Sequence, residues 1–486
     1  MKENLEGKLT EGSVAARLVA FSLPFLMANF LQTLYGMADL FIAGQFNGAD
    51  VITAVSIGSQ IMHMITVIIA GLAMGTTVLT ARAVGAGKER DAGLCAGNSL
   101  LAFLIFSVFA TAILFVFCPQ VVSLMHTPPE AVGETLSYLG ICFLGIPFIS
   151  LYNSVSAVFR GAGDSKRPLY FVAASCLVNI ILDVFFMGPL ALGSRGAALA
   201  TVLSQAFSAF LAAFVLFARG KRGASGEAYG SGGASDEARA SSGSRVKSVA
   251  CVRILRGDFR MDAKVLKALL QIGLPVSAQD GFIQVSFLVI TIIANSRGLS
   301  VAAAVGIVEK IICFLFLVPS SMLSAISALA AQNMGASLHA RARHTLYAGM
   351  AIASAFGALF ALAFQFASVP FVSLFTHDAE VVQLGAQYLR SYVFDCFFAA
   401  FHFAFSGFFC AYGYSLLSFV HNTVSILLVR IPGAYFAAKY FPGTLYPMGW
   451  APAIGSLLSS LICLGFYLLL KRNGKFGGGL ERHGGK

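Results

Sequence analysis

The chain has 486 residues, of which 57% are hydrophobic and only 11% are charged. A soluble protein of this length carries about 25% charged residues, and the mean hydropathy of +0.80 excludes a soluble globular fold. The net charge of +11 does not call for nucleic acid as a partner, because Lys and Arg collect in the cytoplasmic loops of membrane proteins. Composition therefore predicts a polytopic membrane protein.

Twelve apolar stretches of about twenty residues or more follow one another along the chain. Inside a bilayer the backbone must satisfy its own hydrogen bonds, so we expect these stretches to be transmembrane helices of an all-α protein. The approximate helix cores are 18–43, 52–77, 93–118, 132–158, 168–188, 195–218, 268–294, 301–326, 345–369, 382–408, 415–438 and 448–470.

Basic residues mark one side of the membrane. With a cytoplasmic N-terminus, the loops on the outer side hold only Arg195, Arg297 and Lys439. The inner segments hold Lys2, Lys8, Arg17, Arg82, Lys88, Arg90, Arg160, Lys166, Arg167, Arg341, Arg343 and the basic residues of the C-terminal tail. This asymmetry predicts a multi-pass protein of the cell membrane with both termini in the cytoplasm.

The composition changes abruptly after the sixth apolar stretch. Residues 219–262 are rich in Gly, Ser, Ala and charge, which predicts a flexible cytoplasmic linker that buries no core. A solvated tether is the simplest interpretation, although its basic end suits anionic lipid. The predicted organisation is an N-terminal six-helix bundle at 1–218, the linker, a C-terminal six-helix bundle at 263–472 and a cytoplasmic tail at 473–486.

The two halves resemble each other. Four landmarks recur after a nearly constant interval of 250 or 251 residues, namely Leu23-Pro24 as Leu274-Pro275, Gly85-Ala86 as Gly335-Ala336, Tyr138-Leu139 as Tyr388-Leu389, and Phe159 with Gly163 as Phe409 with Gly413. Because six is an even number of helices, both repeats face the same way and form parallel pseudo-repeats. A substrate site is expected between them, as in transporters that rock two bundles.

Asp39 is the residue of the first apolar stretch that costs the most free energy to place inside a membrane. A carboxylate within a membrane-spanning helix costs about 2.5–3.5 kcal/mol on insertion scales, so its presence indicates a function. At about 1.5 Å of rise per residue, Asp183 on the fifth helix and Thr201 on the sixth lie at a similar depth. Asn179 lies one turn from Asp183, and Asn153 on the fourth helix matches that depth to about one turn.

These oxygen-bearing side chains suit a hard cation such as Na⁺. They also suit protons, because two neighbouring carboxylates in a low dielectric cannot easily both stay ionised. Tyr35, one turn before Asp39, is a weaker accessory candidate. For Asn153, Asn179 and Thr201 the alternative is hydrogen bonding between helices.

The second half does not duplicate this set. Apolar residues near 289–290 stand where the first half has Asp39, and Gly433 stands in place of Asp183. Asp280 and Asp395 are accessory candidates for binding a substrate or an ion. The roles of Glu309, Lys310 and Arg430 stay open, because Lys310 or Arg430 could instead neutralise Asp395 or Asp280 in an interhelical salt bridge.

Two further features leave alternatives open. Pro24 either lets the first helix bend when Asp39 changes its charge or simply helps to start the helix. The Phe-rich segment 394–409 either lines an adaptable cavity for aromatic molecules or packs against neighbouring helices and lipid. For His402 and His421, within apolar stretches, interhelical hydrogen bonding is the default interpretation.

Three Gly-rich motifs, in this order and spacing, resemble those of the multidrug and toxic compound extrusion (MATE) transporters: ARAVGAGK at 81–88, FRGAGDSKRP at 159–168 and LGSRGAALATVLSQ at 192–205. The resemblance implies a V-shaped pair of helical bundles. It implies efflux of organic, often cationic, compounds in exchange for Na⁺ or H⁺. It further implies a cation site in the N-terminal lobe at Asp39, Asn153, Asn179, Asp183 and Thr201, with Asp39 and Asp183 as metal ligands if the ion is Na⁺.

We therefore expect a secondary active efflux antiporter that works by alternating access, as a monomer in lipid, on small organic molecules. No Walker A loop, nucleophile elbow, zinc-protease motif or dinucleotide fingerprint is present, so we expect neither an enzyme nor a cofactor beyond the coupling ion. The alternatives are a flippase for lipid-linked precursors, which needs a strongly cationic cavity, and an ion channel or membrane scaffold. The sequence does not choose between Na⁺ and H⁺ and does not name the natural substrate.

Overall fold

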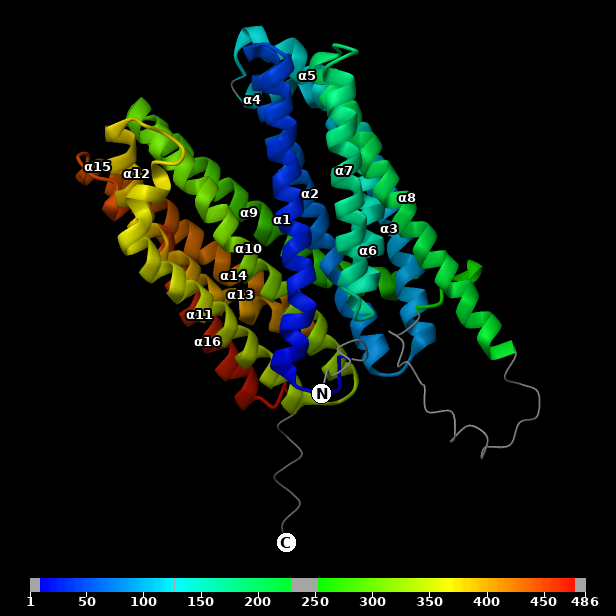
Figure 1. Ribbon diagram of the computed structural model, residues 1–486. Coiled ribbons are helices and arrows are strands. Elements are labelled where there is room, and N and C mark those ends of the chain that lie inside the picture. Colours follow the sequence, from blue (N-terminus) through cyan, green and yellow to red (C-terminus); the bar gives the residue numbers. More distant parts are fainter. Residues whose placement is uncertain (1–8, 126, 229–251, 477–486) are drawn as a thin grey trace. The chain divides into compact units, whose positions relative to one another are not determined.

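The computed structural model describes residues 9–125, 127–228 and 252–476, and Figure 1 shows them as a set of long helices. The described residues contain no β-strand. Within them, eleven helices are long and apolar enough to cross a membrane, and twelve if one bent pair counts as a single span. The prediction of an all-α polytopic membrane protein is confirmed.

The chain divides into two compact units. The N-terminal unit consists mainly of Leu23–Leu270, and the C-terminal unit takes Gly12–Ser22 together with the chain from Gln271 onward. The first helix of each repeat therefore starts in the unit of the other repeat. Arg341 of the C-terminal unit donates to the carbonyl of Gly12 at 2.7 Å, which fixes the start of the first helix there.

Among the described residues of the first repeat, eight α-helices follow one another. Gly145 separates two of them, which are bent by 44° relative to each other and correspond to the single span predicted at 132–158. The helices are α1 (Val14–Phe46), α2 (Ala49–Gly85), α3 (Glu89–Val116), α4 (Cys118–Leu124), α5 (Val132–Leu144), α6 (Ile146–Gly161), α7 (Lys166–Met187) and α8 (Gly193–Ala228).

Among its described residues the second repeat also has eight α-helices, but none corresponds to α4, and its span at 415–438 is divided between two of them. Its one irregular element is a π-helical turn, η4 (Ile426–Arg430), within the predicted span at 415–438. The α-helices are α9 (Ala263–Asn295), α10 (Leu299–Gly335), α11 (His339–Val372), α12 (Ala379–Tyr392), α13 (Phe394–Tyr412), α14 (Ser415–Ser425), α15 (Ile431–Tyr440) and α16 (Tyr446–Arg472).

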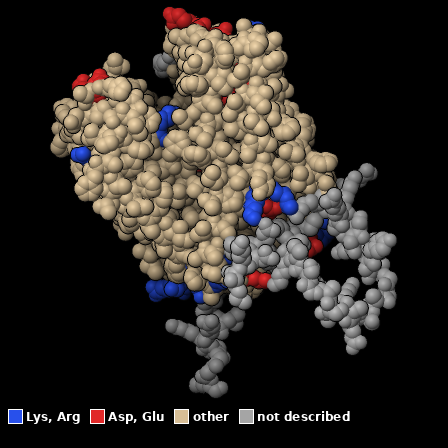
Figure 2. Space-filling view, in the orientation of Figure 1, with Lys and Arg blue, Asp and Glu red and all other residues tan. Residues whose placement is uncertain are grey.

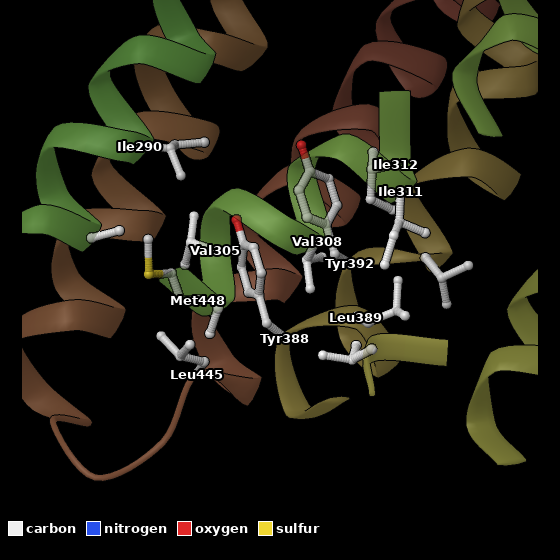
Figure 3. Close-up of a cluster of buried hydrophobic side chains, with 14 of the residues drawn as sticks. Ile290, Val305, Val308, Ile311, Ile312, Tyr388, Leu389, Tyr392, Leu445 and Met448 are labelled. Carbon is white, nitrogen blue, oxygen red and sulfur yellow. The ribbon is translucent and has the colours of Figure 1, made fainter. Parts of the chain in front are cut away.

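Each unit has its own apolar core. In the N-terminal unit the core includes Tyr138, Leu139 and Phe143 of α5, all at most 1% exposed. The corresponding core of the C-terminal unit gathers Tyr388 and Leu389 of α12 against Val305 and Val308 of α10, as Figure 3 shows. The landmark pair Tyr-Leu of the sequence repeat thus marks the same buried position in both units.

The outer faces of the helices are apolar. Figure 2 shows uncharged side chains over most of the helical surface, with Lys, Arg, Asp and Glu gathered toward the helix ends. Large side chains stand exposed there, among them Phe109 at 66%, Phe214 at 71% and Phe366 at 80%. Exposed apolar area of this extent is unfavourable in water and favourable in lipid.

One part of the predicted linker is packed. Asp258 is fully buried and forms a salt bridge with Arg90 of α3, while its Oδ2 accepts the N–H of Leu255 at 2.8 Å. The backbone approaches α3 so closely that a Cβ at Gly97 would lie 2.6 Å from the carbonyl oxygen of Asp258. The expectation of a solvated tether is therefore wrong for residues 252–262, and residues 229–251 lie outside the described residues.

Candidate functional site

Asp39 lies on α1 within the N-terminal unit and is only 2% exposed. Its carboxylate interacts with the side chains of Asp183 and Asn179 on α7 and of Thr201 on α8. The Thr201 hydroxyl lies 3.4 Å from Asp39 Oδ2 and 3.0 Å from the carbonyl oxygen of Ala197, and its single proton can serve only one of them. Three helices therefore bring four of the predicted site residues together.

Asp183 and Asn179 are completely or almost completely buried, at 0% and 1% exposure. They are four residues apart on α7, so they share one face of that helix. Asn179 lies near enough to influence both carboxylates, and the carboxylates influence each other, but none of these contacts has the geometry of a hydrogen bond. The side chains form one continuous polar group inside an apolar unit.

Most oxygens of this group have no hydrogen-bond donor. Among the described residues, Asp39 Oδ1, both oxygens of Asp183 and both polar atoms of the Asn179 amide are buried without a hydrogen-bond partner. No Lys or Arg within the described part of the chain forms a salt bridge with either carboxylate. A buried charge without a partner costs several kcal/mol, so this arrangement favours uptake of a proton or a cation.

The oxygens present are carboxylate, amide and hydroxyl oxygens, which a hard cation accepts as ligands. No group of three or more His, Cys, Asp or Glu side chains suited to a metal ion occurs in the described residues. The ligand set at Asp39 and Asp183 thus contains two acidic groups and depends on Asn179 and Thr201 for the remaining oxygens.

Two tyrosines lie near the carboxylates. Tyr35 of α1 accepts a hydrogen bond of 3.1 Å from Gln205 of α8, which orients its hydroxyl near Asp39. Tyr138 of α5 is 1% exposed and acts electrostatically on both Asp39 and Asp183. The sequence analysis used Tyr138 only as a repeat landmark and did not assign it to the site.

The position of Tyr138 depends on a glycine. A Cβ at Gly58 of α2 would lie 2.2 Å from the Tyr138 ring, a distance that no real Cβ adopts. The missing side chain at Gly58 is therefore what lets this ring lie where it does. Only the three-dimensional contact, and no local sequence pattern, identifies this pair.

Asn153 of α6 does not join the group. Its amide nitrogen donates at 2.9 Å to the carbonyl of Ile149 on its own helix. No described contact links its side chain to Asp39 or Asp183. The structure thus leaves the Asn153 amide facing its own helix, although the residue is only 7% exposed.

The C-terminal unit holds a different polar group. Arg430, at the end of the π-helical turn, donates at 2.8 Å to the Tyr392 hydroxyl and lies over the Phe287 ring at 4.8 Å from its centroid. It interacts electrostatically with two acidic residues, Asp395 of α13 and Glu309 of α10, although the described residues show no salt bridge between them.

Both acidic residues also have a hydroxyl donor. Ser456 of α16 donates to Asp395, and the Thr291 hydroxyl of α9 lies 3.1 Å from Glu309 Oε2 and 3.0 Å from the carbonyl oxygen of Phe287. Of the pairings expected from the sequence, the structure brings Arg430 close to Asp395. Asp280 is half-buried on α9 and takes no part in the described contacts of this group, and Lys310 is exposed.

The structure also shows the surroundings of His421 and Pro24. His421 accepts or donates on both ring nitrogens, to Ser406 of α13 and Ser459 of α16, each at 2.9 Å, so it is an interhelical hydrogen-bonding residue. Pro24 lies inside the continuous helix α1, two residues after the point where the chain passes from the C-terminal to the N-terminal unit.

Similarity to known proteins agrees with this architecture. The chain is 25% identical over 79% of its length to the probable multidrug resistance protein YoeA of Bacillus subtilis, covering 78% of that protein. It is 23% identical over 88% of its length to the probable multidrug resistance protein NorM of Thermotoga maritima, covering 86% of it. The fold matches a MOP superfamily transporter from Pyrococcus furiosus with a TM-score of 0.83 at 22% identity, covering 98% of this chain and 99% of that one.

The sequence model of the MatE family matches the chain twice, at residues 24–185 and 275–436. Both the start and the end of the match recur 251 residues later, so the predicted internal repeat is confirmed. The two matches together span most of both units, and members of this family are membrane transporters rather than enzymes. The chain therefore belongs to the MatE family of multidrug and toxic compound extrusion transporters.

Proposed function

We propose that the protein is a secondary active antiporter that exports organic, often cationic, molecules in exchange for Na⁺ or H⁺ bound at Asp39 and Asp183. The observation that carries the proposal is the buried pair of carboxylates: three of their four oxygens have no hydrogen-bond partner, and neither carboxylate has a salt bridge, among the described residues. The multidrug resistance names of relatives support small organic molecules as substrates. In the membrane, the excess of Lys and Arg on one side supports a cytoplasmic location of both termini.

An ion drives transport only if it binds one conformation more tightly than the other. At Asp39 the ion removes a large desolvation cost, so it stabilises the conformation in which α1 brings Asp39 against α7 and α8. Release of the ion leaves two buried carboxylates that repel each other, which favours a conformation that separates or hydrates them.

Pro24 supplies the place where α1 can bend. Proline has no N–H, so the carbonyl one turn earlier, at Ala20, lacks its usual helical donor and the helix bends there at low cost. Gly12–Ser22 belong to the C-terminal unit, and Leu23–Leu270 belong to the N-terminal unit. About 22 Å of continuous helix separates Pro24 from Asp39, so a rigid α1 can connect the ion site with this point.

The test is transport by proteoliposomes that contain the purified protein, with a Na⁺ gradient and a proton gradient imposed separately. We expect one gradient to drive uptake of an organic cation such as ethidium, and Asp39→Asn to abolish that coupling. Asp50→Asn, the same substitution at an exposed carboxylate at the start of α2, serves as the matched control and should transport normally.

Unchanged ion-driven transport by Asp39→Asn would refute the ion site. Ion flux through the wild-type protein without movement of the organic cation would instead identify a channel. Transport that needs neither gradient would refute the antiport mechanism itself.

A further inference from the structure

Basic side chains gather at the end of the C-terminal unit where α11 begins and α16 ends. Arg343 is half-buried near the start of α11, and Lys471, Arg472 and Lys475 are exposed at the end of α16 and in the turn that follows. Figure 2 shows Lys and Arg side chains at this end, in the lower part of the view. We call these four residues the basic rim.

Contacts between side chains hold the two helices together at the basic rim. The hydroxyls of Tyr347 on α11 and Tyr467 on α16 lie 2.6 Å apart. Arg343 Nη1 donates at 2.8 Å to the carbonyl of Phe476, the last described residue. The Phe476 ring is buried and stacks on Tyr467 with centroids 5.4 Å apart. The basic residues of α11 and α16 therefore belong to one surface.

The two tyrosines indicate the depth of the basic rim in a membrane. Arg343 precedes Tyr347 by four residues, and Lys471 follows Tyr467 by four residues. Each basic residue therefore lies about 6 Å further toward the end of the unit than the tyrosine of its helix. The Tyr347 ring is exposed, and exposed tyrosines of membrane proteins concentrate where hydrocarbon meets headgroups. The basic rim thus lies at the level of lipid headgroups.

An apolar stripe leads from the basic rim along the exposed face of α16. Leu461, Leu464 and Leu468 are exposed and follow one another at intervals of three and four residues. They share one face of the helix, and the same spacing continues to Lys471 and Arg472. A lipid on this face would lay its acyl chains on the leucines and its headgroup on the rim. A soluble anion would leave the stripe unused.

No acidic side chain of these elements neutralises the basic rim. Residues 339–372 and 446–476, which form α11, α16 and the turn after α16, contain no Asp or Glu. Within the described part of the chain, none of the four basic residues forms a salt bridge. The charge of the rim is therefore available to an anion from outside the protein.

The equivalent end of the N-terminal unit is built differently. There α3 has Glu89 and Asp91 in its first turn, where the positive end of the helix favours negative charge. The neighbouring Arg90 forms a salt bridge with the buried Asp258. The first turn of α11 has no acidic residue. In the C-terminal unit, both the helix end and the basic residues favour an external anion.

We propose that the basic rim binds the phosphate headgroup of an anionic phospholipid, such as phosphatidylglycerol, whose acyl chains lie along the exposed leucines of α16. Basic residues between helices at the membrane surface are suited to such headgroups. The headgroup of phosphatidylcholine carries a cation of its own and therefore fits the rim less well. The site concerns a lipid partner, so it depends on neither the ion site nor the proposed transport reaction.

The test uses the full-length protein with Tyr347→Trp and Trp450→Phe, which moves the single tryptophan of the chain to the basic rim. This reporter protein is reconstituted in phosphatidylcholine vesicles that contain phosphatidylglycerol with brominated acyl chains, which quench only nearby tryptophan fluorescence. Brominated phosphatidylcholine at the same fraction is the comparison. We expect phosphatidylglycerol to bind at the reporter with a preference of about 25-fold or more, since each basic residue contributes about fivefold.

Two pairs of substitutions in the reporter protein locate the site. Lys471→Gln with Arg472→Gln should reduce the preference about 25-fold, fivefold for each charge. Lys264→Gln with Lys267→Gln removes the same charge from exposed positions of α9 in the N-terminal unit and should leave the preference unchanged. Lys471→Arg with Arg472→Lys keeps both charges and should keep the preference.

Equal quenching by the two brominated lipids overturns the inference. So does a preference that survives Lys471→Gln with Arg472→Gln, or one that falls equally in Lys264→Gln with Lys267→Gln. Loss of the preference in millimolar inorganic phosphate at constant ionic strength would assign the rim to a soluble phosphate instead. If the reporter protein does not fold, native mass spectrometry compares phosphatidylglycerol binding by the wild type and the two Gln variants, with the same expected order.

Discussion

The two units share a repeated sequence, but they differ in whether their buried carboxylates have a basic neighbour. In the N-terminal unit, Asp39 and Asp183 face each other without a basic partner among the described residues. In the C-terminal unit, Asp395 and Glu309 face Arg430. The described residues of the N-terminal unit therefore give these carboxylates no fixed cation, whereas the C-terminal unit supplies the guanidinium of Arg430.

A single position in the repeat accounts for much of this difference. Arg430 lies 251 residues after Asn179, within one residue of the interval of 250 that relates Asp183 to Gly433. Where one repeat has a neutral amide between two carboxylates, the other has a guanidinium. Coupling to an ion is consequently expected in the N-terminal unit alone, although both units share a fold.

The largest expected effect is a loss of stability when the buried guanidinium of Arg430 is removed. Arg430→Leu removes the basic neighbour of the buried Asp395 and should destabilise the protein by about 3–5 kcal/mol, measured by thermal unfolding in detergent. Asp183→Asn removes a carboxylate that has no basic partner among the described residues. It should therefore change the free energy of unfolding little or even raise it. The double substitution Arg430→Leu with Asp395→Leu should recover much of the loss.

Equal melting temperatures for Arg430→Leu and the wild type would contradict this contrast between the units. So would a loss in Asp183→Asn as large as that in Arg430→Leu.

The next effect is the response of stability to the coupling ion. If the ion is Na⁺, a concentration 100 times its dissociation constant should stabilise the wild type by about 2.7 kcal/mol. Asp39→Asn should lose this response, and Asp395→Asn should keep it, because the proposed ion site lies in the N-terminal unit. If stabilisation by Na⁺ is lost in Asp395→Asn and kept in Asp39→Asn, the ion binds in the C-terminal unit instead.

A smaller effect concerns the tyrosine that both units share. Val308, 250 residues after Gly58, lies in the same apolar cluster as Tyr388, whereas Tyr138 lies directly over Gly58. Gly58→Ala should force Tyr138 away from the carboxylates at a cost of about 1–3 kcal/mol and reduce ion-driven transport.

Gly306→Ala on α10 is the matched control for Gly58→Ala. A Cβ at Gly306 meets nothing within 4 Å among the described residues. This substitution should be neutral or stabilise α10 by up to about 1 kcal/mol. If both alanine variants behave alike, the close packing of Tyr138 on Gly58 is not what places the ring.

Much of this architecture follows from patterns that a sequence displays. Hydropathy predicts the spans, the constant interval predicts the repeat, and the depths of Asp39, Asp183 and Thr201 predict that their helices bring them together. These inferences work because helices have a fixed rise per residue and because a bilayer fixes their depth. The roles of these residues in ion binding stay predictions.

Other features depend on contacts between distant segments and escape such patterns. Tyr138 reaches the site only because Gly58 has no side chain, and residues 252–262 pack only because α3 offers a glycine face. Arg430 is buried at the end of a π-helical turn, yet the length and hydropathy of that span predict only a membrane helix. Each of these depends on packing between elements, which composition and periodicity do not encode.

The smallest expected effect compares one turn in the two units. The α2–α3 turn and the α10–α11 turn have equivalent backbone hydrogen bonds, from Lys88 to Ala83 at 2.9 Å and from Leu338 to Asn333 at 2.8 Å. Gly87 adopts a left-handed φ of 70° in the first turn, and Ser337, 250 residues later, adopts a φ of 61° in the second. Only glycine takes this conformation without steric cost.

Ser337→Gly should therefore stabilise the C-terminal unit by about 0.5–1 kcal/mol, since relief of about 1–2 kcal/mol of strain is partly offset by the greater freedom of glycine when unfolded. Gly87→Ser should destabilise the N-terminal unit by a similar amount. Thermal unfolding of both variants measures the two shifts against one wild type. If both variants shift the melting temperature in the same direction, the two turns are not equivalent. The repeats would then share their helices but not the backbone angles of this turn.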